Sequence, residues 1–396
     1  MKVAMVTSYE RPCGIAQYVE HLEPELRKVH RNLSILPLPI DDFRSRGAVA
    51  RKGADRHFNE IVSSASAAEI VNVQFEPGLF GMYPLESWKR VKKLISASKR
   101  LVITLHTMPD DRRIPIGSMF NPQALVAGIA EWRLVWLYRM LFSLIRRSGK
   151  KCAFIVQTRR AQRTLLYEGF DESRVLDHPL AFVSPEKRQS ITREKAREII
   201  GRRFSLNSDD KWIGFFGFIA QYKGLNSLIE ALAELPKEFK LLVVGNLHPL
   251  SLVKGRFDRP YLSKILQLID EKTSKGRVFF CGTLANDDYQ VAITACDYVV
   301  LPYFEVGQTS SGPASMALDL HANLFLSRTE CFLELEKYAR NCIEFFDIGN
   351  YVELAQSVAR YNRSPEREAA LKEYTDRYNL ETRVRTYLKA FEKVLG

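Results

Sequence analysis

The sequence lacks the short motifs that identify several common classes of enzyme and metal protein. Its six cysteines are scattered and form no C-x-x-C pair, so we predict neither a zinc site nor a dithiol motif but reduced thiols in a cytoplasmic protein. No G-x-G-x-x-G follows the first apolar run, and no Walker A loop or G-x-S-x-G elbow occurs. Asp-x-Asp is also absent, so the sequence predicts no metal site for a nucleotide diphosphate.

Long apolar segments are equally scarce. A strand-like run begins at Val3, directly after Lys2, without the pattern of a signal peptide. Residues 132–145 include 11 apolar residues of 14, but the run is short and interrupted by Arg133 and Arg139, so it cannot span a bilayer. We predict either a helix packed on a sheet or an interfacial helix with basic anchors.

Acidic residues are rare in one part of the chain, and this imbalance carries the whole net charge of +12. Residues 86–163 hold 17 lysines and arginines but only four acidic residues. Such a segment attracts anionic surfaces such as lipid headgroups, or it is a solvated face without a partner. No zinc-finger spacing or RNA-binding aromatic motif accompanies the charge, so nucleic acid is not a predicted partner.

Apolar runs typical of buried parallel strands alternate with helical patterns along most of the 396 residues. This alternation predicts a doubly wound α/β fold, and the length predicts two domains. The charged stretch 184–211 is poor in strand signal, so we place the boundary near 182–208, with a connecting helix inside it. The predicted strands are 2–7, 33–38, 69–74, 100–105 and 153–157, then 211–217, 239–244, 276–281, 297–302, 323–327 and 343–346.

The stretch 213–229, IGFFGFIAQYKGLNSLI, joins a strand-like run to a helical pattern through a short turn that contains Lys223 and Gly224. Such a turn places backbone N–H groups, and here a lysine, where an anion can sit. A lysine ammonium suits a phosphate as a point charge. The stretch therefore predicts an anion site or, alternatively, an ordinary turn with a surface lysine.

Open α/β sheets bind ligands at the carboxyl ends of their strands, so the loops there are the candidate sites. Ser310, Ser311 and Gly312 begin a predicted helix near 313–320, where free N–H groups bind anions or a serine serves only as a cap. His106 directly follows the run LVITL, which favours a functional over a structural histidine. The candidate loops are 8–14, 75–78, 106–107, 218–224, 282–284 and 303–312.

Taken together, these loops resemble those of the retaining glycosyltransferases of family 4, which have the GT-B fold. The similarity runs over most of the chain and is strongest at RVFFCGTLANDDYQVAITACDYVVLPY (277–303). Other similar segments are GIAQY (14–18), VNVQFEPGLFG (71–81), VITLHT (102–107) and GFFGFIAQYKGLNSLIEAL (214–232). The resemblance implies two Rossmann-like doubly wound α/β domains facing a cleft. The acceptor-binding domain is expected over 1–185 and the donor-binding domain over 208–378, with a C-terminal helix, 379–396, that crosses back to the first domain.

The resemblance also implies a nucleotide-sugar donor, UDP- or GDP-linked, with no cofactor and no metal. Lys223 would contact its diphosphate, Gly14 would close over it, and His106 would contact the sugar near the anomeric carbon. His106, Lys223 and Glu305 form the implied catalytic set. The implied donor-binding residues are Gly14, Gly217, Phe218, Gly282, Thr283, Leu284, Gly307, Gln308, Thr309, Ser310, Ser311, Gly312 and Met316, and the acceptor-side candidates are Tyr9 and Glu76.

The chain departs from the family pattern in two places. Phe218 stands where the family usually has an arginine, which removes one bidentate phosphate contact. The two glutamates of the family's E-x7-E motif appear as Gln308 and Met316, and Glu305 is the expected substitute for the first of them.

These observations predict a retaining hexosyltransferase that acts on a glycan or lipid-linked acceptor in the synthesis of a surface polysaccharide or glycoconjugate. We expect it in the cytoplasm, with the basic segment docking it on the anionic inner membrane leaflet. The missing glutamates motivate a second hypothesis, an inactive binding or assembly protein of the same fold. A third is another GT-B enzyme, such as a sugar-nucleotide epimerase or an inverting transferase, for which Glu76 is the candidate base.

Overall fold

The computed structural model describes residues 1–11, 13–45, 47–109, 122–247, 259–272 and 276–396, which form two compact units. The first unit comprises Met1–His178 with Arg383–Gly396, and the second comprises Pro179–Thr382. The sequence predicted boundaries at 185 and 379 instead. Residues that follow His178 belong to the second unit, where the Asp319 carboxylate accepts hydrogen bonds from the N–H groups of Phe182 and Val183 at 2.7 and 3.1 Å.

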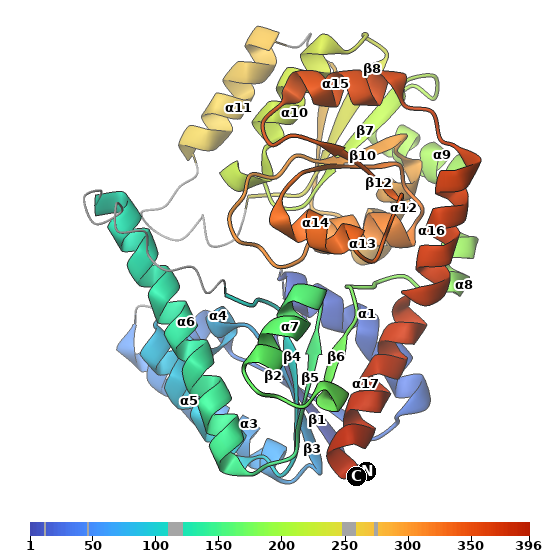
Figure 1. Ribbon diagram of the computed structural model, residues 1–396. Coiled ribbons are helices and arrows are strands. Elements are labelled where there is room, and N and C mark those ends of the chain that lie inside the picture. The colour runs from blue at the N-terminus through green and yellow to red at the C-terminus, as the bar shows by residue number, and fades with distance from the viewer. Residues whose placement is uncertain (12, 46, 110–121, 248–258, 273–275) are drawn as a thin grey trace. The chain divides into compact units, whose positions relative to one another are not determined.

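The first unit is built on a six-stranded parallel sheet in the order β2-β1-β3-β4-β5-β6 (Figure 1). Strands β1, β3, β4 and β5 are buried along their whole length, because their residues are apolar on both faces or pair their polar groups within the unit. The strands are β1 (Val3–Thr7), β2 (Leu33–Pro37), β3 (Ile70–Phe75), β4 (Leu101–Leu105), β5 (Cys152–Val156) and β6 (Val175–Asp177).

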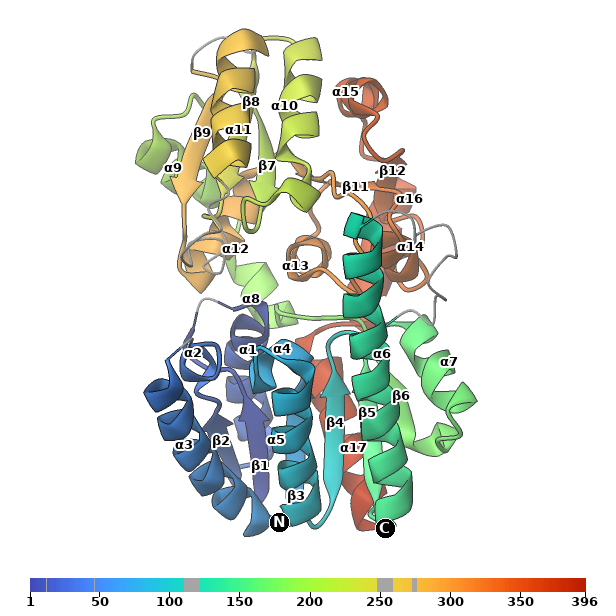
Figure 2. The ribbon, with the colours of Figure 1, turned by 90° about the vertical axis from the view of Figure 1, so that its left-hand side faces the viewer.

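Helices cover both faces of this sheet. α3, α5, α6 and α7 bury an apolar core against one face, and α1 and α17 pack on the other, as Figure 2 shows for α5 in front of the sheet and α17 behind it. The helices are α1 (Gly14–Val29), α2 (Ile40–Phe43), α3 (Ala48–Ser66), α4 (Pro77–Phe80), α5 (Pro84–Ala97), α6 (Pro122–Ser148), α7 (Arg159–Tyr167), η2 (Glu172–Arg174) and α17 (Leu380–Leu395).

The second unit contains a six-stranded parallel sheet in the order β12-β11-β10-β7-β8-β9. α10, α11 and α15 enclose an apolar core on one face, while α9 and α12 pack together on the other. The strands are β7 (Lys211–Phe216), β8 (Phe239–Val244), β9 (Val278–Gly282), β10 (Tyr298–Leu301), β11 (Leu324–Ser327) and β12 (Ile343–Phe346).

The helices of the second unit follow the strands in the alternation that the sequence predicted. They are α8 (Pro185–Ser190), α9 (Arg193–Phe204), η3 (Gln221–Lys223), α10 (Leu225–Glu234), α11 (Arg259–Lys272), α12 (Asn286–Ala295), α13 (Gly312–Asp319), α14 (Glu330–Glu336), α15 (Tyr351–Arg360) and α16 (Pro365–Arg377). Eleven strands lie within two residues of their predicted bounds. β6 was not predicted, because three residues, VLD, are too few to show a strand pattern.

The apolar segment 132–145 lies in α6, whose side chains at Leu137, Tyr138, Leu141, Phe142 and Ile145 are buried in the core of the first unit. Of the two alternatives for this segment, the structure supports the helix packed on a sheet.

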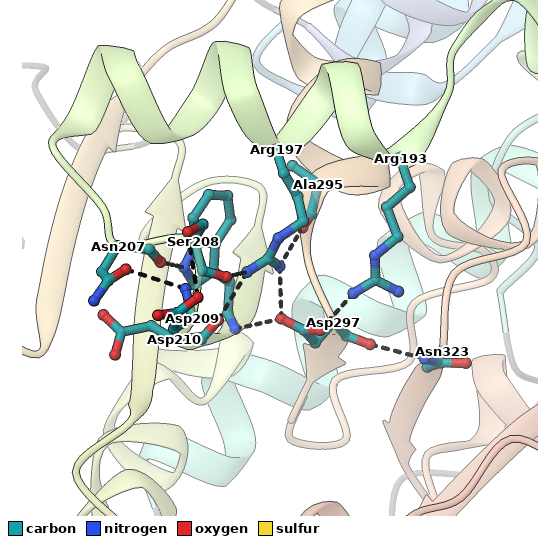
Figure 3. A network of polar contacts seen from close by, with 10 residues as sticks. Arg193, Arg197, Asn207, Ser208, Asp209, Asp210, Ala295, Asp297 and Asn323 are labelled. Atoms are coloured by element: carbon teal, nitrogen blue, oxygen red, sulfur yellow. Dashed lines mark hydrogen bonds and ion pairs between the residues drawn. The ribbon is translucent and has the colours of Figure 1, made fainter.

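A network of polar contacts centred on Asp297 braces the second unit (Figure 3). The Asp297 carboxylate accepts hydrogen bonds from Arg193, from Arg197 at 2.8 Å and from the Trp212 N–H at 2.7 Å. The Arg197 guanidinium also donates to the carbonyls of Ser208 and Asp210 and stacks 4.0 Å from the Trp212 ring centroid. The network therefore ties α9 to the beginnings of β7 and β10.

Candidate functional site

The order of the strands marks one place in each unit where a ligand site is expected. In the second unit, β7 and β10 are neighbours, and the following strands continue outward on opposite sides of this pair. Open α/β folds form their ligand-binding crevice between the loops that follow two such strands, so a crevice is expected at the carboxyl ends of β7 and β10. These loops contain Lys223 and the segment 303–312, so the fold brings together two of the candidate loops.

Lys223 is buried with 5% of its surface exposed, so the alternative of a surface lysine is wrong. Its ammonium lies 3.7 Å from the centroid of the Tyr303 ring and 4.9 Å from that of Tyr222. Among the residues that the structure describes, none forms an ion pair or a hydrogen bond with this ammonium. Burial lowers the pKa of Lys223 to about 7. Among the described residues, the rings of Tyr303 and Tyr222 are the groups that stabilise the charged form of Lys223, an environment that an anionic ligand would complete.

The two loops of the crevice are held in direct contact. The Phe304 N–H donates to the Tyr222 carbonyl at 2.7 Å. Gly224 has a φ of +70°, and a Cβ atom there would lie 1.8 Å from the Pro302 carbonyl oxygen. Only glycine permits this approach, so Gly224 fixes the position of Lys223 against the end of β10.

The loop 303–312 leads into α13 with its first N–H groups uncapped by a side chain. Ser311 occupies the N-cap position but its hydroxyl lies 3.2 Å from the hydroxyl of Tyr303 instead. The side-chain amide of Gln308 donates to the Ser310 carbonyl, and Gly307 has a φ of +72°. The alternative of a serine that serves only as a cap is therefore wrong, and the N-terminus of α13 retains its capacity for an anion.

Glu305 braces this loop. One carboxylate oxygen accepts the Gly307 N–H at 2.9 Å, and the other accepts the Glu330 N–H, in the first turn of α14, at 2.7 Å. Both oxygens are thus engaged by the backbone. The structure therefore gives Glu305 a role in positioning this loop, and its catalytic role stays a prediction.

Three glycines follow the adjacent strands β7, β8 and β9. Gly217, Gly245 and Gly282 have φ values of +117°, +146° and +66°. The Gly217 N–H donates to the Val244 carbonyl and the Gly245 N–H to the Gly282 carbonyl, at 3.0 and 2.8 Å. A Cβ at Gly245 would lie 1.9 Å from the Gly217 carbonyl oxygen. Gly245 was missed in the sequence, although it ends a strand-like run as Gly217 does.

The remaining donor-binding candidates differ in accessibility. Thr283 is exposed and Leu284 is buried in the loop that precedes α12. Phe218 and Thr309 are half-buried beside Gly217 and Gln308 in the chain. Met316 is 1% exposed in α13, so its side chain offers almost no surface to a ligand. The implied contact of Met316 with the donor therefore lacks an accessible group.

The first unit has its own switch point between β1 and β3, and its candidates Gly14, Tyr9 and Glu76 lie in the loops there. Gly14 begins α1, is exposed, and a Cβ there would meet nothing within 4 Å. The Tyr9 hydroxyl donates to Glu23, an interaction that raises the pKa of Tyr9 to about 12. Burial raises the pKa of Glu76, whose carboxylate accepts a hydrogen bond from the Thr107 hydroxyl.

His106 stands at the end of β4 with both ring nitrogens engaged. Nδ1 lies 3.0 Å from the amide nitrogen of Gln157, and Nε2 lies 2.8 Å from the amide oxygen of Gln74. Gln157 therefore donates to Nδ1, and the Nε2–H group donates to Gln74. Burial, together with the charge of Arg383, lowers the pKa of His106 to about 3. A neutral imidazole held in this way cannot act as a proton shuttle while these bonds persist.

α17 supports this histidine through a buried polar network that sequence reasoning missed. The Tyr387 hydroxyl lies 3.0 Å from both the Gln74 amide nitrogen and the Thr104 hydroxyl. Arg383 is fully buried and donates to the Tyr18 hydroxyl and the His178 carbonyl, both at 2.6 Å. The sequence contained one signal of this network: Gln74 is a polar residue within a run that is otherwise typical of a buried strand. Nothing in the sequence distinguishes Arg383 from the other basic residues of its helix.

No group of three or more His, Cys, Asp or Glu side chains within the described ranges is arranged to hold a metal ion. In the part of the chain that the structure describes, no helix is both long and apolar enough to cross a bilayer.

Comparison with known proteins points to one family. Residues 196–307 match the family model described as Glycosyl transferases group 1. A 2-deoxystreptamine glucosyltransferase of Streptomyces kanamyceticus is 30% identical over 149 residues, which are 37% of this chain. The match spans only about a third of that relative's length (35%).

Solved structures of similar fold cover nearly the whole chain. One is Anabaena Alr3699/HepE in complex with UDP and glucose, with a TM-score of 0.65, 15% identity and 99% of both chains covered. Another is a sucrose-phosphate synthase from Thermosynechococcus elongatus, with a TM-score of 0.69, 14% identity and coverage of 100% and 99%.

The fold of this chain is that of the GT-B glycosyltransferases, as the resemblance implied. Within that fold, the segment that matches the group 1 glycosyltransferase model, residues 196–307, lies in the unit that contains Lys223.

Proposed function

We propose that this protein is a retaining glycosyltransferase of family 4 that transfers a hexose from UDP- or GDP-sugar to a glycan or lipid-linked acceptor without a metal ion. The observation that carries the proposal is the buried ammonium of Lys223, which pairs with no acidic group of the described residues, at the switch point of the second sheet. The Anabaena protein of the same fold binds UDP and glucose, which supports a nucleotide sugar as the donor.

The proposed chemistry follows from the charges that form as the donor breaks. The bond between the anomeric carbon and the diphosphate oxygen breaks, and its electron pair stays on the diphosphate. Lys223 and the free N–H groups at the start of α13 stabilise this negative charge. The acceptor hydroxyl attacks from the same face, and its proton passes to the leaving diphosphate, so that no carboxylate nucleophile is needed. The absence of Asp-x-Asp in the sequence agrees with charge neutralisation by Lys223 and the backbone.

Calorimetric titration with UDP and GDP, in the presence of EDTA, tests the donor site directly. We expect one of the nucleotides to bind to the wild-type protein and binding to be lost in Lys223→Ala. The configuration at the anomeric carbon of the product, measured by NMR, distinguishes retention from inversion. A protein that binds the donor but releases no nucleoside diphosphate with any acceptor would favour the inactive assembly protein, and an epimerised sugar nucleotide would favour an epimerase.

We also propose that the first unit docks on an anionic membrane, with the product serving a surface polysaccharide or glycoconjugate. Four large apolar side chains are exposed near the start of α5 and in the neighbouring α6: Met82, Tyr83, Leu85 and Trp132, with 42–59% of their surfaces exposed. Trp88 lies about one helical turn after Leu85 in α5, and Trp136 lies about one turn after Trp132 in α6. Their ring centroids are 6.4 Å apart, so the two helices are in contact here. Lys89, Lys92 and Lys93 are exposed on α5, so apolar and basic groups share one face.

The structure narrows the basic residues that can take part. Arg90 is 6% exposed, donates to Asp55 and to the Phe80 carbonyl, and lies 4.0 Å from the Phe43 ring centroid, so its role is structural. The Lys150 ammonium donates to three backbone carbonyls at the C-terminal end of α5. The predicted basic segment is thus partly internal, and its residues 110–121 lie outside the described residues.

Co-sedimentation with vesicles tests the docking proposal. We expect binding to vesicles that contain phosphatidylglycerol but not to pure phosphatidylcholine. Lys89→Glu combined with Lys92→Glu should abolish it, whereas reversal of two exposed lysines of the second unit, Lys195 and Lys272, should leave it unchanged. If both double variants lose vesicle binding equally, net charge alone determines binding, and the proposed docking face on α5 is wrong.

A further inference from the structure

The second unit contains a pocket that two of the candidate loops, 218–224 and 303–312, form together with α10 and α11. It has a volume of about 570 Å³ and is lined chiefly by Gln221, Tyr222, Asn226, Tyr261, Lys264 and Phe304. These residues come from η3, α10, α11 and the loop after β10. Cavities of 300–1,000 Å³ are the usual size of a small-molecule site, so the pocket can hold one or two sugar rings.

The walls of the pocket are aromatic and fixed. The hydrogen bond between the Phe304 N–H and the Tyr222 carbonyl, at 2.7 Å, joins the backbones of two of the three aromatic residues. Tyr261 is 9% exposed, and its hydroxyl donates to the Asn226 side-chain oxygen at 3.3 Å. The face of an aromatic ring carries partial negative charge, which attracts the weakly positive C–H groups on the face of a pyranose. Rings that are already ordered also lose little entropy on binding.

The polar groups that line the pocket favour a ligand with an acidic group. Tyr261 occupies the side-chain oxygen of Asn226, which leaves the amide N–H groups as the donors that the pocket can use. Lys264 is exposed and forms no ion pair with any residue that the structure describes. Among the residues that the structure describes, no acidic side chain lines the pocket. Ammonium and amide donors without a carboxylate match a carboxylate or phosphate better than a neutral sugar.

Tyr222 connects this pocket with the proposed donor site. Its ring lines the pocket, and the ammonium of Lys223 lies 4.9 Å from the centroid of the same ring. We propose that the pocket binds a sugar that carries an acidic group, a uronic acid or a sugar phosphate, as a part of the acceptor. This inference rests on the proposed glycosyltransferase function and names the chemistry of the second substrate.

Calorimetric titrations with glucuronate, glucose 6-phosphate and glucose test the inference on the full chain. We expect at least one of the two acids to bind at least tenfold more tightly than glucose. Which acid binds better distinguishes a carboxylate from a phosphate. Binding that persists when UDP saturates the protein places the acid outside the Lys223 site. An acid that UDP displaces completely, equal affinity for glucose and the acids, or no binding of any of the three would overturn the proposal.

Lysine variants of α11 distinguish binding in the pocket from a general effect of the protein's net charge. Lys264→Ala should lower the affinity for the acids to that for glucose, and Lys264→Arg should retain most of it. Lys272→Ala, eight residues further along α11 and outside the pocket, is the matched control and should change nothing. If Lys272→Ala weakens binding as much as Lys264→Ala, the pocket is not the site. A protein that binds UDP but neither acid contradicts this inference alone, whereas one that binds an acid but no nucleotide contradicts the proposed function.

Discussion

If Lys223 binds the donor as proposed, donor binding should be coupled to proton uptake. At pH 8 a lysine with a pKa of about 7 is about 90% neutral, whereas a bound diphosphate restores its charge. We therefore expect UDP to bind with uptake of close to one proton at pH 8, and the affinity to fall about tenfold per pH unit above 7. Titration in buffers of different ionisation enthalpy measures the uptake. Lys237→Ala, an exposed lysine of the same unit, should leave the uptake intact, and a pH-independent affinity of the wild type would contradict the site.

His106 is expected to remain neutral far into the acid range. Its pKa of about 3 lies below the value of about 6.5 for an exposed histidine. The unfolded chain thus binds more protons between these values, so this residue's contribution to stability is present above pH 6.5 and is lost as the pH falls toward 3. Nitrogen NMR at pH 5 should show a neutral ring protonated on Nε2. An imidazolium signal at that pH would show that the hydrogen bonds to Gln74 and Gln157 do not hold it.

At the scale of elements, two glycines at loop–helix junctions should respond in opposite ways to the same change. Gly224→Ala forces a Cβ into the Pro302 carbonyl, so we expect a large loss of stability, about 3 kcal/mol or more. A Cβ at Gly14 meets open space at the start of α1, so Gly14→Ala should leave the free energy of unfolding within about 1 kcal/mol. Denaturant unfolding measures both.

If Gly14 closes over a donor, the stable Gly14→Ala variant should still bind the substrate more weakly. Unchanged KM and kcat would contradict that role of Gly14.

The Asp297 brace is an element-scale contact whose loss should be felt throughout the second unit. Asp297→Ala removes the carboxylate that accepts from the Arg193 and Arg197 guanidiniums and from the Trp212 N–H, although Arg197 keeps its backbone acceptors. We expect the free energy of unfolding to fall by about 2–4 kcal/mol, because the removal of one acceptor takes a hydrogen bond from several donors at once. Asp209→Ala, in the exposed turn before β7, is the control and should cost less than about 1 kcal/mol. Equal losses in the two variants would mean that the network contributes no more than a surface charge.

The sequence predicted the elements well because most strands are short apolar runs, and both sheets need such strands buried on both faces. It located Lys223 because a strand, a turn and a helix are contiguous there. It could not find the partners that lie far along the chain. Tyr303 against Lys223 depends on the pairing of β7 with β10, and Tyr387 beside Gln74 depends on where α17 packs. Side-chain burial was also out of reach, as Met316 and Arg90 show.

At the scale of the whole molecule, the last helix belongs to the unit that begins the chain. Tyr387, Ala390, Phe391 and Val394 are buried in the first unit, together with Arg383. Removal of residues 383–396 would expose this apolar surface and leave Gln74 and Thr104 without the Tyr387 hydroxyl. We therefore expect the first unit of the truncated protein to unfold at a much lower temperature than in the full chain.

The same truncation leaves every group of the proposed donor site in place, because Lys223, Tyr303 and Ser311 all lie within Pro179–Thr382. UDP should therefore still raise the unfolding temperature of the second unit by mass action, while the first transition does not respond. Calorimetric scans with and without UDP resolve the two transitions. A single cooperative transition that UDP shifts as a whole would show that the units do not unfold independently, and a loss of the UDP effect would show that the donor site needs an intact first unit.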